Sequence, residues 1–160
     1  MMKFSHIVIL FITFFASAGM AVSQTSSGTQ EYGDGGAYEG EFLNGLPHGN
    51  GTYELPNGYR YVGEWFEGEI NGQGEALFPN GSVYIGSFVK GKPEGSGKIT
   101  FTDGGTYEGE WANGSITGEG YAKYANGTTY QGTFLDAMHD GKGIMKSPDG
   151  YIYDLSLIHI

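Results

Sequence analysis

The sequence contains no cysteine and few basic residues among its 160 positions. Without cysteine the chain can form no disulfide and no thiolate zinc site, and it has no thiol nucleophile. Lysine and arginine together number 8 against 18 acidic residues, and the formal net charge is −10. Because nucleic-acid binding depends on basic side chains that neutralise phosphates, this balance argues against a nucleic-acid partner.

Glycine and aromatic residues are abundant instead. The chain has 30 glycines, and 15% of its residues are aromatic. The glycines do not recur at every third position, which excludes collagen, and the aromatic content is unlike that of disordered chains. Each glycine inside a helix costs about 1 kcal/mol relative to alanine, so a helical fold is disfavoured. The composition therefore predicts a turn-rich β protein.

Residues 1–23 follow the order of a secretory signal peptide. Lys3 precedes an apolar run at 7–15, and small residues follow this run at 16–19. The run is shorter than the roughly 20 residues of a membrane span. We therefore expect an exported chain, placed outside the cell, in a periplasm or in the lumen of the secretory pathway, after cleavage behind Ser23.

Two alternatives to this cleavage remain open. Cleavage after Ala18 or Ala21 also satisfies the small-residue rule, and the segment could stay uncleaved as an N-terminal membrane anchor. The polar residues 24–31 that follow are expected to form a flexible tether.

A period of 23 residues, without insertion, organises the chain from residue 38 onward. Each unit starts with tyrosine, has glycine two residues later and a large aromatic residue four residues later. Glycine recurs eleven and thirteen residues after the tyrosine. The aromatic positions are Tyr38, Phe42, Tyr61, Trp65, Tyr84, Phe88, Tyr107, Trp111, Tyr130 and Phe134. The glycine positions are Gly40, Gly49, Gly51, Gly63, Gly72, Gly74, Gly86, Gly95, Gly97, Gly109, Gly118, Gly120, Gly132, Gly141 and Gly143.

The period divides the chain into five units and two flanks. The units are 38–60, 61–83, 84–106, 107–129 and 130–152. Before them, residues 34–37 (DGGA) stand three periods ahead of residues 103–106 (DGGT), so that 24–37 combine the tether with a degenerate partial repeat.

The alternation within each unit predicts a β-hairpin. In Tyr-x-Gly-x-aromatic, alternate residues point to one face of a strand, and the segment after Gly-x-Gly keeps the same period. A loop such as 44–48 joins the two strands, and a closing Asn-Gly or Asp-Gly pair supplies the next turn with its positive φ. We expect an all-β fold: a single-layer, meandering antiparallel sheet of tandem hairpins. Interior glycines would leave hollows for aromatic rings, unless they serve only as turn residues.

One unit shows the resemblance of the repeat to a known family. Residues 107–114 (YEGEWANG), followed by Gly118 and Gly120, resemble the membrane occupation and recognition nexus repeat, or MORN repeat. The resemblance covers five units from 38 to 152. It implies a module for protein interaction and scaffolding, which in some proteins accompanies a kinase or methyltransferase domain.

Residues 153–160 are off the pattern. Tyr153 continues the tyrosine series, but Leu155 stands where a sixth unit would need glycine, and residues 155–160 (LSLIHI) resemble translated adapter sequence. The start of a sixth repeat, an artefactual tail on a truncated gene and a C-terminal capping strand are the alternatives.

No set of residues has the spacing of a catalytic or metal site. Residues 95–98 (GSGK) lack the Ser or Thr and the helix of a phosphate loop. The histidines form no pair with metal-ligand spacing, and we expect His48 to pack in a loop; they are His6, His48, His139 and His159. We therefore predict no catalytic residue, no metal site, no cofactor and no enzymatic activity.

The face opposite the aromatic positions is expected to be acidic. Its glutamates are Glu39, Glu41, Glu54, Glu64, Glu75, Glu108, Glu110 and Glu119. A solvated surface is the expected role, and weak Ca²⁺ binding is the alternative.

Repeat arrays act by presenting an extended surface. We therefore expect a non-catalytic, exported module for interaction or scaffolding, which contacts protein partners through an aromatic-rich sheet surface. A homodimer through the exposed edge strands is a further expectation. The negative charge disfavours contact with membrane lipid. The alternatives are a lipid-contacting module and a docking or regulatory region of a larger enzyme that is truncated at its C-terminus.

Overall fold

The computed structural model describes residues 24–157 as one sheet of twelve antiparallel strands, paired in chain order. The expected signal peptide, residues 1–23, and the end of the tail, residues 158–160, lie outside the described residues. The strands are β1 (Thr25–Glu31), β2 (Ala37–Leu43), β3 (Leu46–Glu54), β4 (Arg60–Phe66), β5 (Glu69–Leu77), β6 (Val83–Val89), β7 (Lys92–Thr100), β8 (Thr106–Ala112), β9 (Ser115–Lys123), β10 (Thr129–Leu135), β11 (Met138–Lys146) and β12 (Ile152–Leu157).

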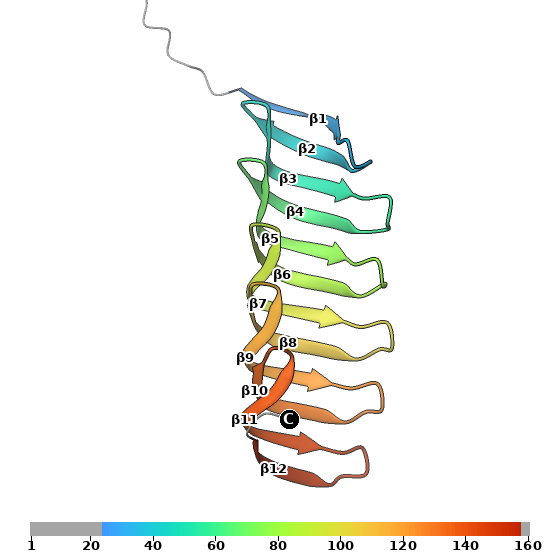
Figure 1. Ribbon diagram of the computed structural model, residues 1–160, viewed down its shortest axis with the longest axis vertical. Coiled ribbons are helices and arrows are strands. Elements are labelled where there is room, and N and C mark those ends of the chain that lie inside the picture. Colours follow the sequence, from blue (N-terminus) through green and yellow to red (C-terminus); the bar gives the residue numbers. More distant parts are fainter. Residues whose placement is uncertain (1–23, 158–160) are drawn as a thin grey trace, which may run out of the picture.

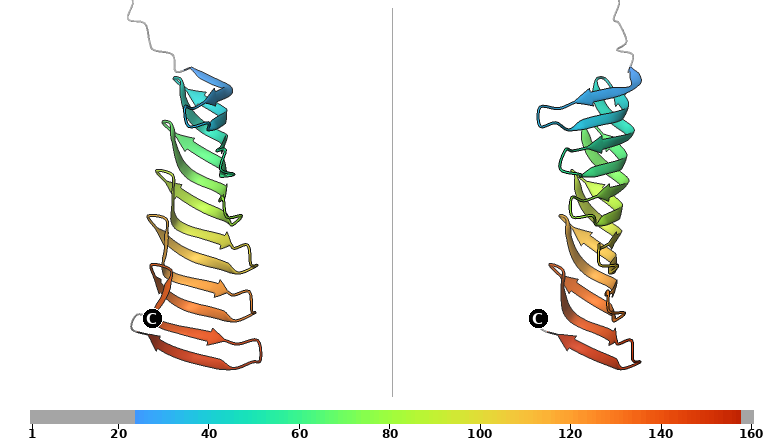
Figure 2. Two further views of the ribbon diagram at one scale, coloured as in Figure 1. Left: turned by 45° about the vertical axis from the view of Figure 1, so that its right-hand side comes forward. Right: turned by 90° about the vertical axis from the view of Figure 1, so that its right-hand side faces the viewer.

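The sheet is a narrow single layer. Figure 1 shows the strands following one another along the long axis, and the two views of Figure 2 show their direction turning progressively around it. This twist is the normal behaviour of β-sheets. The predicted all-β, single-layer meander is thus confirmed. Among residues 24–157 there is no helix with the length and apolar character needed to cross a membrane.

A row of glycines crosses the sheet at the middle of its strands. Gly40 lies opposite Gly51, which lies opposite Gly63, and the row continues through β11. Its members are Gly28, Gly40, Gly51, Gly63, Gly74, Gly86, Gly97, Gly109, Gly120, Gly132 and Gly143. Leu155 of β12 ends the row opposite Gly143.

Each repeat lays a tyrosine ring over two of these glycines. A β-carbon at Gly97 would overlap the ring and hydroxyl of Tyr84, and one at Gly86 would also overlap the hydroxyl. The Tyr84 hydroxyl donates a hydrogen bond to the carbonyl oxygen of Ser87, at 3.0 Å. Tyr38, Tyr61, Tyr107 and Tyr130 make the same bond to the residue three positions on. The prediction that interior glycines make room for rings is confirmed at these positions.

The tyrosines also join neighbouring repeats. The Tyr84 ring contacts Phe88 of its own repeat at 5.1 Å between centroids, and Trp111 of the next repeat at 4.9 Å, both edge to face. The same alternation links all rings from Phe42 to Phe134. Edge-to-face pairs are a preferred arrangement of aromatic rings. A single-layer sheet thereby obtains a continuous core, in which all five tyrosines are at most 2% exposed.

The turn inside each repeat is tighter than the sequence predicted. Asn44 and Gly45 both have positive φ, 53° and 81°, which is the signature of a two-residue type I′ hairpin. The expected loop 44–48 is therefore wrong in its extent, since 46–48 belong to β3. In the next repeat, the second residue of this turn donates its backbone N–H to a carbonyl oxygen of the repeat before it. The Gly68 nitrogen, for example, donates to the Pro47 carbonyl oxygen at 2.8 Å.

The turn between repeats uses the predicted Asn-Gly or Asp-Gly pair. At 55–59 the Gly58 amide donates to the Leu55 carbonyl at 3.0 Å, and the Asn57 side chain accepts from the Tyr59 amide at 2.9 Å. Only the glycine of the pair has positive φ, 91° at Gly58. The asparagine thus acts through its side chain and not through a left-handed backbone.

The first glycine of each Gly-x-Gly pair has a different task from the one we predicted. The register shifts between Gly63 and Trp65, where β5 bulges, and Gly72 has a φ of 115°. The Glu64 carboxylate fills the space beside Gly72 and accepts the Gln73 amide at 2.6 Å. This position is therefore glycine because the bulge requires a left-handed residue, and not because a ring covers it.

The expected flexible tether is wrong for residues 25–31. They form β1, which pairs with β2 along its whole length. Pairing satisfies backbone groups of β2 that would otherwise be exposed at a sheet edge. Gly28 takes its place in the glycine row, 23 residues before Gly51. The 23-residue spacing of Gly28 from Gly51 indicates that the repeat period extends to residues 25–31.

The C-terminal strand β12 adds one more strand to the sheet. Tyr153 lies opposite Met145, in the same register in which Tyr130 of the preceding repeat lies opposite Ala122. No described strand follows to cover Tyr153, and its side chain is half exposed. β12 thus pairs with β11 in the same register in which β10 pairs with β9.

We predict that Gly97→Ala destabilises the array. The added β-carbon would overlap the Tyr84 ring, which cannot move aside because Trp111 covers it and its hydroxyl is bonded. Overpacking of this kind costs about 2 kcal/mol in the free energy of unfolding, to be measured by urea denaturation. Gly33→Ala is the control, since a β-carbon there meets nothing within 4 Å; it should change stability by less than about 0.5 kcal/mol. Equal losses in both variants would contradict the role of the ring.

Candidate interaction surface

The two faces of the sheet differ in what they leave exposed. We call the face with the repeat tyrosines the tyrosine face, and the other, with residues one and three positions after each tyrosine, the carboxylate face. On the tyrosine face the rings bury one another: Trp65, Phe88, Trp111 and Phe134 are at most 7% exposed. Contact with a partner through an aromatic-rich surface, as expected from the sequence, is therefore not supported at these rings.

The buried hydroxyls reinforce this structural role. Burial, together with the charge of Glu94, raises the pKa of Tyr84 to about 12. Burial likewise raises the pKa of Tyr107 to about 12. The hydroxyls consequently stay protonated and remain hydrogen-bond donors at neutral pH.

Exposed apolar side chains gather on the carboxylate face instead. Val62, Ile85, Tyr121 and Ile144 occupy its central row, and each is at least 38% exposed. Cross-strand pairing places polar residues between them, such as Glu75 between Val62 and Ile85. Further exposed apolar residues of this face are Leu46, Phe66, Leu77, Val89, Leu135 and Met138. The acidic face predicted from the sequence is thus acidic and apolar in alternation.

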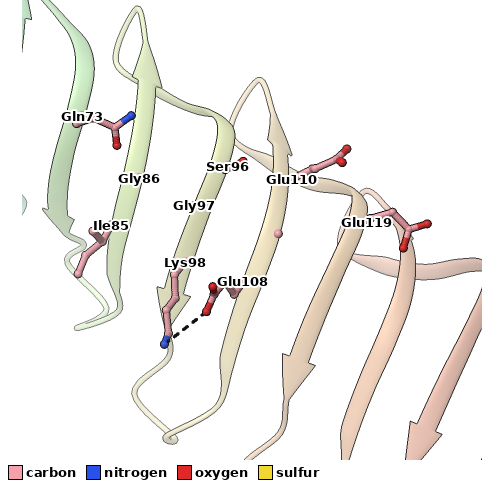
Figure 3. Close-up of a pocket in the computed structure, with 10 residues that line it drawn as sticks. Gln73, Ile85, Gly86, Ser96, Gly97, Lys98, Glu108, Glu110 and Glu119 are labelled. Carbon is pink, nitrogen blue, oxygen red and sulfur yellow. Dashed lines mark ion pairs between the residues drawn. The ribbon is translucent and has the colours of Figure 1, made fainter.

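The carboxylate face is hollowed by shallow depressions. One depression, of about 620 Å³, is open to solvent and lies over β5 to β9; its lining includes Ile85, Lys98 and Glu108. In Figure 3 these side chains point from adjacent strands toward the same side of the sheet. Lys98 and Glu108 form an ion pair at 3.7 Å, and Glu119 lies at the other end of the depression. Two further depressions, of about 490 and 360 Å³, lie over β1 to β4.

The predicted glutamates of this face have different partners. Glu41 and Glu64 accept backbone amides at the bulges of their repeats, at 3.2 and 2.6 Å, and so contribute to the fold. Glu54 pairs with Arg60 at 2.8 Å. Within residues 24–157, Glu75 has neither an ion-pair nor a hydrogen-bond partner. Its carboxylate is therefore available for contact with another molecule.

The described part of the chain contains no group of three or more His, Asp or Glu residues placed to hold a metal ion. The calcium site considered for the acidic face thus has no cluster of ligands in residues 24–157.

His48 and His139 lie in strands β3 and β11, not in loops. His48 packs against the exposed ring of Phe66, at 5.3 Å. His139 stacks on Tyr130 at 3.7 Å, and its Nε2 lies 2.6 Å from the Tyr124 hydroxyl. Burial lowers the pKa of His139 from its usual 6.5. It occupies the position of Ile70 and Ile116 in earlier repeats, opposite the second aromatic residue.

The family model of the MORN repeat matches five consecutive segments of the sequence: 38–58, 61–83, 84–106, 107–129 and 130–150. The chain belongs to the MORN repeat family. The MORN resemblance seen in the sequence is thus confirmed, and the MORN repeat is a non-catalytic repeat module. No curated protein matches the sequence.

Two solved structures resemble this MORN array. One is the TCP10 domain of Danio rerio CPAP in complex with a peptide of Danio rerio STIL, at 16% identity and a TM-score of 0.42; the match covers 82% of this chain and 64% of that one. The other is the SAS-4 (dCPAP) TCP domain in complex with a proline-rich motif of Ana2 (dSTIL) of Drosophila melanogaster, at 13% identity and a TM-score of 0.44; it covers 93% and 99%.

Sequence reasoning missed the apolar part of the carboxylate face in this MORN array. The signal was available, because Val62 and Ile85 stand at the position that is Glu39 and Glu108 in other repeats. The regular aromatic series favoured the tyrosine face as the binding surface, but its repeat rings are buried against one another.

We predict that His139 makes the stability of the fifth MORN repeat depend on pH. Because its pKa is lower in the folded chain than in the unfolded one, the unfolded chain binds the proton first as the pH falls. The stabilisation by neutral His139 is thus complete above about pH 6.5 and declines below it. The variant His139→Ile should gain in melting temperature relative to the parent between pH 7.5 and pH 5. A difference that is constant over this range would contradict the prediction.

Proposed function

We propose that the chain is a non-catalytic protein-interaction module that contacts its partners through the carboxylate face. The observation that carries the proposal is the unequal use of the two faces. On the tyrosine face the repeat rings bury one another, and rings that stay exposed there, such as Tyr124, lie at the turns. The carboxylate face instead leaves large apolar side chains exposed along its central row, in shallow depressions. Exposed apolar residues with a polar rim are typical of protein-binding surfaces.

The shape of the sheet favours a protein partner over a small ligand. The depressions are open, and they follow one another along the array over β1 to β9. Small-molecule sites are instead concave pockets that enclose most of their ligand. An extended surface of this kind suits a segment or face of another protein, which is the usual mode of repeat arrays.

We predict that partner capture depends on the carboxylate face. The tagged chain and its variants would be incubated with extracts of the source cells, and retained proteins identified by mass spectrometry. Ile85→Gln should lose the specific partners, because it removes the most exposed apolar side chain of the central row. The control Tyr151→Gln removes an aromatic ring that is 66% exposed in a turn outside this face, and should retain them.

Retention of the same proteins by both variants, or of none above the tag alone, would overturn the proposal. Circular dichroism and thermal melting of each variant would verify that the sheet is intact, so that a lost partner reports the surface and not the fold.

Export of the chain is a second part of the proposal. It rests on the charged, apolar and small-residue order of residues 1–23. We expect the chain expressed in its source cells to be recovered outside the cytoplasm with Gln24 as its first residue, as read by N-terminal sequencing. Recovery in the cytoplasm with Met1 retained would contradict export.

A further inference from the structure

The carboxylate face is not uniform along the array. Residues 24–83 contain nine acidic residues and a single basic one, Arg60, whereas residues 84–160 contain six lysines against nine acidic residues. Arg60 is already bound to Glu54 at 2.8 Å. The first part of the sheet therefore carries most of the uncompensated negative charge.

An apolar patch lies within this acidic region. Val62, Leu77, Val83 and Ile85, which we call the β4–β6 patch, stand on adjacent strands of the carboxylate face. Leu77 lies opposite Val83, and Glu75 lies between Val62 and Ile85. Ile85 is 55% exposed, and Val62 and Leu77 are each more than a third exposed. The patch thus surrounds one carboxylate with four apolar side chains.

Glu75, at the centre of this patch, is a carboxylate that the fold does not use. Glu64 on the neighbouring strand holds a bulge, and Glu54 holds Arg60. Glu75 has no such partner in the part of the chain that the structure describes. A carboxylate among apolar side chains interacts most strongly with a cationic side chain that is itself flanked by apolar residues. Contact between the apolar residues removes water from the ion pair, and this partial desolvation strengthens the pair.

We propose that the β4–β6 patch binds a basic amphipathic segment of a partner protein, with apolar side chains on Val62, Leu77 and Ile85 and a lysine or arginine on Glu75. The proposal rests on the proposed function and adds the chemistry of the partner. The same charge argues against other occupants. A second copy of this acidic chain, an anionic membrane and a nucleic acid would each bring negative charge to negative charge.

The experiment uses three synthetic peptides and the full chain. The first is a 14-residue peptide of leucine and lysine, with leucines at helical spacing; the second has glutamate for every lysine, and the third has serine for every leucine. Binding is measured by fluorescence anisotropy at low and at physiological ionic strength. We expect the leucine–lysine peptide to bind and the other two to bind at least about tenfold more weakly, because both charge and apolar contact are needed.

Matched variants separate this patch from general attraction to an acidic protein. Glu75→Gln and Ile85→Gln should each weaken binding of the leucine–lysine peptide by about tenfold. Their controls, Asp149→Asn and Tyr151→Gln, remove a carboxylate and an exposed ring in a turn outside the carboxylate face, and should alter the affinity by less than about twofold.

Equal binding of the glutamate peptide, or equal losses in variants and controls, would overturn the inference. Capture of natural partners tests the proposed function separately from this inference. If the capture of natural partners is lost in Ile85→Gln but is unchanged by Glu75→Gln and by added salt, the proposed interaction module is supported and the proposed basic segment is contradicted. If no partner depends on Ile85, the module itself fails.

Discussion

The tyrosine ring that lies across two glycines is the constraint on which the structure depends. A single-layer sheet has no second layer to cover its apolar face, yet a sheet normally requires one. Here the absence of β-carbons in the glycine row lets each ring sink against the backbone, and its hydroxyl fixes it by a bond to the residue three positions on. The aromatic residues of the same and the following repeat then close over it. The core is thus built within one layer, from rings on backbone.

This constraint explains why the period is kept without insertion. A ring contacts the aromatic residue of the next repeat, and the amide of that repeat's turn bonds back to the preceding strand. An extra residue in any strand would reverse the faces beyond it and separate ring from glycine. The central row of the carboxylate face does not have to pack against rings of the next repeat. Its residues differ from repeat to repeat, with Glu39, Val62 and Ile85 at equivalent positions.

Much of the fold could be predicted because the repeat states the same pattern five times. The hairpins, their order and the pairing of rings with glycines follow from spacing alone. The limits are equally physical. Residues 25–31 read as a tether because they have no aromatic residue, but their backbone pairs with β2 and Gly28 fits the row. The first glycine of each Gly-x-Gly pair was assigned to ring packing, because a bulge leaves no separate mark in the sequence. We expected a partner to contact the tyrosine face, since the sequence shows which side chains are large but not which are already covered.

The pairing of every strand with its neighbours in the chain has a consequence for how the protein is made. Nothing in residues 24–157 has to wait for a distant segment, because each hairpin needs only the one before it. Assembly can proceed hairpin by hairpin as the chain emerges from the ribosome or from a translocation channel, and loop-closure entropy stays low at each step. A growing sheet of this kind always presents one unfinished edge, and the next repeat to emerge is the segment that covers it.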